Sequence, residues 1–180
     1  MRVKVDIEHI IHVTLILIIL TIINGVAQAD GTQAVKAITG KHTRVVWIQD
    51  QDESGSGDSG KFLLMGLDSL DGKGERKILP GIDNYHKPLL TPDGQRVVFS
   101  NLDKNRNYVV NFDGSGLREI GDGQAADVWQ DPQTGVVWIY VAYPEGNDRW
   151  GDVQRVQLDH PEKKEPVWNK TPVTVDNFQL

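Results

Sequence analysis

The apolar positions of this chain fall in short runs of five to eight residues, rich in Val, Ile, Trp, Phe and Tyr. Clusters of Gly, Asp, Asn and Pro separate the runs, and no helical spacing of apolar residues lasts beyond one turn. Runs of this length between turn residues are typical of β-strands. The pattern therefore predicts an all-β chain.

One strand pattern, two valines before an aromatic residue, occurs three times, at residues 44–48, 96–100 and 135–139. Each copy is followed by a polar loop and three further strand-like segments, the last of them at 85–90, 126–130 and 175–180. Four antiparallel strands in a repeat of about 40–45 residues are the signature of a β-propeller blade. We therefore predict three blades, at residues 39–90, 91–130 and 131–180.

The Val-Val-aromatic strand is expected to be the inner strand of each blade. The turn Thr91-Pro92-Asp93-Gly94 is then expected to link the outer strand of one blade to the inner strand of the next, because Pro92 fixes φ at its second position. The predicted core between blades consists of the leading-strand residues Val45, Val46, Trp47, Val97, Val98, Phe99, Val136, Val137 and Trp138.

Residues 88–100 (PLLTPDGQRVVFS) resemble the blade junction of TolB-like and WD-repeat-like β-propellers, and residues 111–120 (NFDGSGLREI) continue the resemblance. The first and third repeats follow it more loosely, so that it covers roughly residues 39–180. The resemblance implies a ring of six to eight blades that serves as a protein-binding scaffold or as an accessory domain of an exported enzyme. It transfers no catalytic residue. Closed propellers use about 4–8 blades, so we expect an incomplete propeller, completed by a longer chain or by self-association.

The N-terminus has the features of a secretory signal peptide. Arg2 and Lys4 precede an apolar stretch at 13–23, and Ala27-Gln28-Ala29 is a cleavage site of the A-x-A type. The alternative, an uncleaved membrane anchor, needs about 20 apolar residues. We predict that residues 1–29 are removed, that residues 30–38 are a lead-in segment in which 34–38 could form a strand, and that the protein is exported to the periplasm or the medium.

Composition narrows the classes of function. The chain has no cysteine, which excludes thiol chemistry, disulfide scaffolds and lipoprotein anchoring. Its formal net charge of −6 argues against nucleic acid or an anionic membrane as partner. No nucleophile elbow or phosphate-binding loop occurs. Three histidines remain after removal of residues 1–29, His42, His86 and His160, and none has metal-ligand spacing to another.

The loop after the first leading strand has calcium-binding spacing. Asp50, Asp52, Ser54 and Asp58 occupy positions 1, 3, 5 and 9 of the sequence DQDESGSGD, and Gly is at position 6. Oxygen ligands at this spacing around a glycine turn are how a loop wraps Ca²⁺. Position 12 is Lys61 instead of the bidentate Glu of an EF-hand, and a polar hairpin loop is the alternative. The spacing predicts a Ca²⁺ site.

A second loop, residues 143–151, is long for a hairpin and carries Tyr143, Arg149 and Trp150. These residue types are enriched where proteins bind partners, and packing of the loop on its own blade is the alternative. Three hypotheses follow: a non-catalytic exported scaffold that binds protein or carbohydrate, the N-terminal propeller of a larger exported peptidase, hydrolase or polysaccharide lyase, and a structural module closed by homo-oligomerisation.

Overall fold

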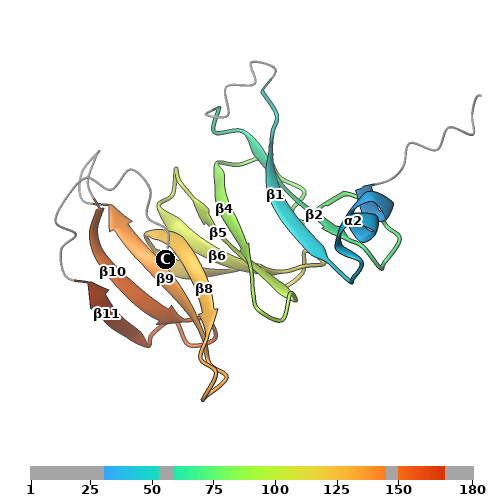
Figure 1. Cartoon of the computed structure of the whole chain (residues 1–180). Helices are drawn as coiled ribbons and strands as arrows, with labels where there is room; N and C mark the ends of the chain where they lie inside the picture. The colour runs from blue at the N-terminus through green and yellow to red at the C-terminus, as the bar shows by residue number, and fades with distance from the viewer. Residues whose placement is uncertain (1–30, 53–58, 145–149, 169–180) are drawn as a thin grey trace, which may run out of the picture.

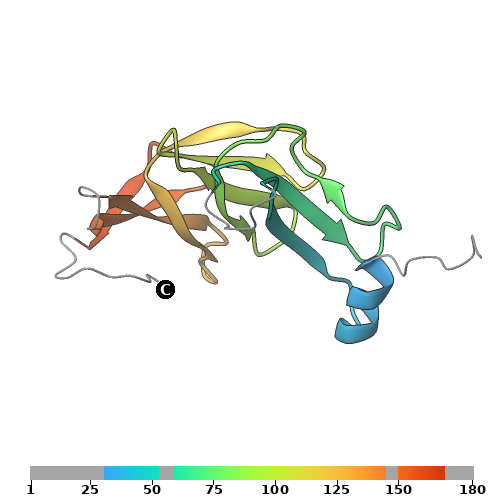
Figure 2. The ribbon, with the colours of Figure 1, turned by 90° about the horizontal axis from the view of Figure 1, so that it is seen from above.

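Three antiparallel β-sheets follow one another along the chain, with one helix before them (Figure 1). The computed structural model describes residues 31–52, 59–144 and 150–168. Strand orders are β1-β2-β3, β4-β5-β6-β7 and β8-β9-β10-β11, so neighbours in each sheet are also neighbours in sequence. Seen from above, the sheets fan out side by side (Figure 2). This is the arrangement of consecutive blades in a β-propeller, and it confirms the all-β prediction of a partial propeller.

The elements have the following bounds: α2 Gly31–Thr39, β1 Arg44–Asp50, β2 Phe62–Asp68, β3 Arg76–Lys77, β4 Tyr85–Leu90, β5 Arg96–Asn101, β6 Arg106–Asn111, β7 Arg118–Asp122, β8 Gln124–Gln130, β9 Val137–Pro144, β10 Trp150–Gln157 and β11 Lys164–Trp168. Among the described residues, no helix combines the length and the apolar character needed to cross a membrane. The predicted strand at 175–180 and the signal peptide lie outside the described residues.

The lead-in segment is a helix, so the strand expected at 34–38 is wrong. Residues 33–37 (QAVKA) are mostly good helix formers. The helix ends at Thr39, and Gly40 follows with φ +64°. The Gly40 amide donates to the Lys36 carbonyl at 2.9 Å, which is a common way to end a helix with a left-handed residue.

The strands are grouped into sheets differently from the expected grouping. β4 pairs with β5, and β8 pairs with β9, so the boundaries placed at 90/91 and 130/131 fall inside hairpins. The Thr91 amide donates to the Arg96 carbonyl at 2.9 Å, and the Gly94 amide donates to the Thr91 carbonyl at 2.7 Å. The turn with Pro92 therefore returns the chain onto its own sheet, since a tight turn joins antiparallel neighbours. The Val-Val-aromatic strand β5 lies second in its sheet, behind β4.

The third repeat is offset by one residue from the alignment on Val-Val-aromatic. Leu90 is opposite Val97, and Gln130 is opposite Val137 in the equivalent hairpin. Val137 thus corresponds to Val97, and Trp138 corresponds to Val98. Because side chains alternate along a strand, a slip of one residue moves each of them to the other face of the sheet.

Each junction between sheets contains its own apolar core. The first core joins Phe62 and Leu64 of β2 to Val97 and Phe99 of β5. The second core joins Val98, on the other face of β5, to β9 and β10, with the buried members Val98, Val109, Ile120, Ala125, Ile139, Val141, Val156 and Leu158. β5 is therefore buried on both faces, which explains why its sequence is apolar without alternation.

Three residues of the predicted core, in the first and third sheets, lie on the faces turned away from the second sheet. Val46 packs against the first core, so Val45 and Trp47 lie on the opposite face of β1, turned away from the second sheet. Val45 is 37% exposed and Trp47 is half-buried. Trp138 is buried, but it lies on the face of β9 away from the second sheet, with the Arg155 guanidinium 4.3 Å from its ring centroid.

Candidate functional site

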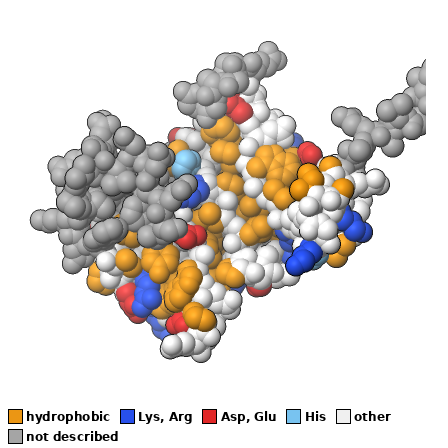
Figure 3. All heavy atoms as spheres, in the orientation of Figure 1, with side chains coloured by type: hydrophobic (Ala, Val, Ile, Leu, Met, Phe, Trp, Pro, Cys, Tyr) orange, Lys and Arg blue, Asp and Glu red, His pale blue; other side chains and the backbone are white. Residues whose placement is uncertain are grey.

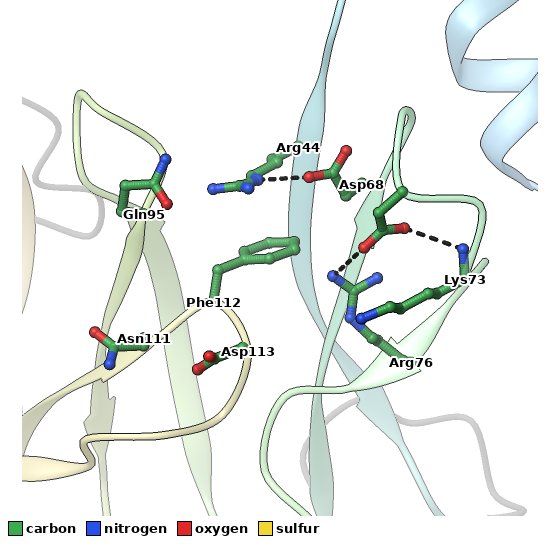
Figure 4. A pocket seen from close by; sticks show the side chains of 9 residues that line it. Arg44, Asp68, Lys73, Arg76, Gln95, Asn111, Phe112 and Asp113 are labelled. Carbon is green, nitrogen blue, oxygen red and sulfur yellow. Dashed lines mark hydrogen bonds and ion pairs between the residues drawn. The ribbon is translucent and has the colours of Figure 1, made fainter.

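Two arginines of the first sheet close its junction with the second sheet. Arg44, at the start of β1, donates from Nη1 to the Gly94 carbonyl at 2.7 Å. Its guanidinium lies 4.8 Å from the centroid of the Phe112 ring, and that of Arg76, at the start of β3, lies 5.0 Å from the same ring (Figure 4). Phe112 is buried directly after β6. The ring is thus held by two cation–π contacts from the neighbouring sheet.

The second junction repeats this arrangement with other partners. Arg96, at the start of β5, pairs with the Asp159 carboxylate. Arg118, at the start of β7, donates to the Leu158 carbonyl and lies 3.5 Å from Asp159. Leu158 and Asp159 follow β10 as Phe112 and Asp113 follow β6. Each junction is therefore joined by two arginines that reach the loop after the third strand of the next sheet.

Asp68 is the buried anion at the first junction. Its carboxylate accepts from Arg44 Nε at 2.7 Å, from His42 Nε2 at 2.8 Å and from the Leu70 amide at 2.9 Å. Burial opposes the charged form, but the hydrogen bonds outweigh it, led by that from Arg44, and lower the pKa of Asp68 from 3.8 to about 2. Asp68 is therefore a permanent anion at neutral pH that fixes the position of Arg44.

An open polar cleft of about 370 Å³ lies over this junction. Arg76 pairs in it with Asp71 at 2.8 Å, and the Lys73 amide donates to Asp71 at 3.0 Å. Figure 4 shows Arg44, Arg76 and Lys73 near the Phe112 ring, with Gln95, from the turn before β5, and Asn111, at the end of β6, on the other side. The complete lining is Arg44, Asp68, Asp71, Lys73, Arg76, Gln95, Asn111, Phe112 and Asp113.

A second cleft of about 380 Å³ lies at the other junction. Like the first, it collects residues from the start of a second strand and from the end of a third strand. Its lining is Asp93, Arg96, Gln130, Gly135, Val136, Val137, Gln157, Asp159 and His160. The two clefts present hydrogen-bond donors and acceptors of both charge signs at successive sheet junctions.

Two acidic groups that line the first cleft are paired with arginines. Within residues 31–52, 59–144 and 150–168, no three His, Asp or Glu side chains come together in a way that could hold a metal ion. Three acidic groups line the first cleft: Asp68 pairs with Arg44, Asp71 pairs with Arg76, and Asp113 accepts from Ser115 Oγ at 2.6 Å. Such fixed ion pairs can orient a ligand, because their geometry is held by the surrounding sheets.

The predicted calcium ligands are only partly within the described residues. Asp50 and Asp52 lie at the end of β1, where Asp50 Oδ1 accepts from the Asp52 amide at 2.8 Å and from Ser59 Oγ at 2.6 Å. That oxygen organises a local turn. Ser54 and Asp58 lie outside the described residues, so the Ca²⁺ site stays a prediction.

The predicted partner loop is described only at its ends. Tyr143 lies in β9, half-buried, and packs against the second core. Burial, with a smaller contribution from the charge of Asp122, raises the pKa of its hydroxyl. Trp150 begins β10, where its backbone pairs with Pro144, and Arg149 lies outside the described residues. The structure thus assigns Tyr143 a packing role and leaves the loop as a prediction.

Two features of the sheets were not expected from the sequence. The first strands β4 and β8 both contain a register shift, between His86 and Leu89 and between Ala125 and Asp127. In β4, Lys87 has φ +44°, and burial, followed by the charge of Lys87, lowers the pKa of His86. Irregular edge strands resist pairing with other chains. In the sequence, Pro88 is the residue that could have indicated the irregularity of β4.

The junction arginines are the second feature. Arg44 and Arg96 occupy the same place before Val-Val in their repeats, and Arg76 and Arg118 begin the last strands of theirs. The recurrence of these arginines is visible in the sequence. Their acceptors in the next sheet become apparent only when the repeats are aligned according to the observed strand pairing.

No family model matches the chain, and no curated protein matches it. Among solved structures, an oligogalacturonate lyase in complex with manganese is similar at 18% sequence identity with a TM-score of 0.41. The match covers 59% of this chain and 30% of the lyase chain, so this chain spans less than a third of that structure. The propeller-type fold rests on the three sheets themselves, and the resemblance to TolB-like proteins in particular stays a prediction.

Proposed function

We propose that this chain is an exported, non-catalytic β-propeller segment that binds a protein or carbohydrate ligand through the polar clefts at its sheet junctions. The observation that supports this function most directly is the repetition of the cleft. Clefts of about 370 and 380 Å³ lie at the two junctions, and each is lined by the arginine before a Val-Val pair and by an aspartate that follows the third strand of the next sheet. A ligand with a repeating polar pattern, such as an oligosaccharide or an extended peptide, can contact both clefts at once.

Binding to arrays of neutral and acidic oligosaccharides and of extended peptides tests this function. We expect at least one class of probe to bind, and we expect Lys73→Glu, which reverses a charge in the first cleft, to weaken that binding at least tenfold. Lys163→Glu makes the same charge change at an exposed residue that lines neither cleft, and it should leave binding unchanged. No binding by any probe, or equal binding by both variants, would contradict the proposal.

The alternative proposal is that these sheets form the N-terminal propeller of a larger exported enzyme, a peptidase, hydrolase or polysaccharide lyase. The described residues form three sheets, fewer than the 4–8 blades that close a propeller ring, which favours further sheets on the same polypeptide. Sequencing the transcript beyond codon 180 distinguishes the two proposals. Further blades followed by a hydrolase or lyase motif would support the enzyme, and a stop codon would exclude it.

A further inference from the structure

We propose that a small pocket at the first junction, at the opposite end from the polar cleft, binds a proline residue of an extended peptide. This inference does not depend on whether the clefts bind a ligand, because no residue lines both the pocket and a cleft. It rests on the apolar walls of the pocket, on the hydrogen-bond donors at its mouth and on the charges around it.

The pocket and the polar cleft lie at the two ends of β5. The cleft collects residues from before β5 and from the end of β6, whereas the pocket collects Asn101, at the end of β5, and Lys104, in the turn that follows. The pocket has a volume of about 90 Å³. It is therefore a separate and smaller site at the same junction.

Three aromatic rings form one wall of the pocket. Phe99 of β5 meets the Tyr85 ring of β4 edge to face, with the centroids 5.3 Å apart, and stacks on the Tyr108 ring of β6 at 5.6 Å. Leu79, from the segment between β3 and β4, and Leu117, directly before β7, complete the apolar lining. Leu117 is 52% exposed, so the apolar lining reaches the surface.

The apolar group that fits this pocket is small. A cavity of about 150 Å³ holds benzene, so a pocket of about 90 Å³ admits a smaller group, such as the pyrrolidine ring of proline. Figure 3 shows hydrophobic side chains on the face that carries β1 and β4, but polar atoms lie between them there. The pocket instead gathers its apolar side chains around one cavity.

The mouth of the pocket offers hydrogen-bond donors. Lys104 donates from Nζ to Asp83 Oδ2 at 2.6 Å, and its ammonium carries two further N–H groups. The hydroxyls of Tyr85 and Tyr108 lie close enough to this ammonium to interact with it electrostatically. Within the described part of the chain, neither hydroxyl has a hydrogen-bond partner. A ligand can therefore place an acceptor at the mouth.

The charges around the mouth favour a neutral acceptor over an anion. Asp83 accepts from Lys104 and, through Oδ1, from the Asn84 amide at 2.9 Å. Asp103, in the same turn as Lys104, accepts from Asn84 Nδ2 at 2.7 Å. Two carboxylates thus accompany one ammonium, and a third negative charge is disfavoured. The polar group that suits the mouth is a carbonyl.

A proline residue joins a small apolar ring to a carbonyl group and has no N–H that needs an acceptor. Proline-rich segments also bind aromatic-lined grooves, because their extended conformation is already formed. The ring enters between Leu79, Phe99 and Leu117. The proline carbonyl accepts from the hydroxyl of Tyr108, whose side chain is half-buried, whereas Tyr85 is buried.

Calorimetric titration of the full chain with a neutral polyproline peptide, acetylated and amidated at its ends, tests the site. We expect binding at millimolar peptide, and at least tenfold weaker binding of a peptide in which alanine replaces every proline. Lys73→Glu, in the polar cleft, should leave polyproline binding unchanged, which separates this site from the clefts. No binding of polyproline, binding of N-acetylglucosamine in its place, or weakening by Lys73→Glu would overturn the proposal.

Two matched pairs of variants locate the bound proline. Tyr108→Phe should weaken polyproline binding about fivefold, the effect of losing one hydrogen bond, and Tyr140→Phe, at a half-buried tyrosine outside the pocket, should not. Leu117→Asn should weaken binding at least fivefold and Leu70→Asn should not, because both leucines are largely exposed but only Leu117 lines the pocket. Equal effects within either pair would contradict the site.

Discussion

Asp68 is the residue whose charge matters most at the first junction. It is buried, and three donors from three different residues meet its two oxygens. Arg44 also donates to the Gly94 carbonyl of the second sheet. Asp68 therefore holds in place a side chain that joins the two sheets. Loss of the carboxylate leaves a half-buried guanidinium without its partner, which is costlier than loss of an exposed ion pair.

The pH dependence of stability should report this carboxylate. Its pKa falls from 3.8 to about 2 on folding, so its contribution is fully present above about pH 4 and is lost as the pH falls toward 2. The shift corresponds to about 2 kcal/mol. In urea unfolding at pH 6, Asp68→Asn should be less stable than the unaltered chain by about that amount, and the gap should shrink by pH 2.

Asp159→Asn is the control for that measurement, because Asp159 pairs with Arg96 at the second junction but its side chain is 59% exposed. Its effect at pH 6 should be much smaller, since exposed pairs contribute little. If the difference in unfolding free energy between Asp68→Asn and the unaltered chain stays constant between pH 6 and pH 2, the lowered pKa of the Asp68 carboxylate is contradicted.

At the scale of elements, the spacing between the first two sheets depends on close backbone contact. A Cβ atom at Gly114, in the loop after β6, would lie 2.4 Å from the Ile78 carbonyl oxygen, which belongs to the segment between β3 and β4. Gly114 has φ +89°. A side chain there would therefore force the second sheet away from the first.

Gly114→Ala should destabilise the protein by about 2 kcal/mol more than Gly72→Ala, which is a matched control. Gly72 also has positive φ, +66°, so both substitutions carry the backbone cost of a left-handed alanine. No atom lies within 4 Å of a Cβ at Gly72. Urea unfolding of the two variants separates the backbone cost from the contact between sheets, and equal losses would contradict the close approach.

The strands themselves could be predicted from sequence because their signal is local. Runs such as residues 96–101 are apolar and bounded by turns, and the structure has strands there. The grouping of strands could not be predicted in the same way. The turn Thr91-Pro92-Asp93-Gly94 is compatible with a hairpin inside a sheet and with a link between blades, and only the pairing of β4 with β5 decides between them.

The one-residue offset in the third repeat has a related cause. Val136, Val137, Trp138 and Ile139 are all apolar, so the strand lacks the alternation that fixes which residue faces which side. The junction clefts were missed because their partners are distant in sequence. Arg96 meets Asp159, which lies 63 residues further along the chain, and no local pattern records such a contact.

At the scale of the whole molecule, the two apolar cores and the two arginine junctions make the three sheets a repeating series. Each sheet begins with an edge strand and continues with its most apolar strand, and the second sheet is covered on both faces by its neighbours. In the second and third sheets the Val-Val-aromatic strand lies second, behind β4 or β8, whereas in the first sheet it is β1, the first described strand.

Nuclear Overhauser effects between Hα protons test this strand order. Leu90 and Val97, and Gln130 and Val137, are opposite each other in pairs without direct hydrogen bonds, the pairs in which the backbones of antiparallel strands lie closest. The strand order described here predicts strong Hα–Hα cross-peaks for both pairs. Absence of these cross-peaks, with cross-peaks instead between residues 85–90 and residues 75–79, would contradict it.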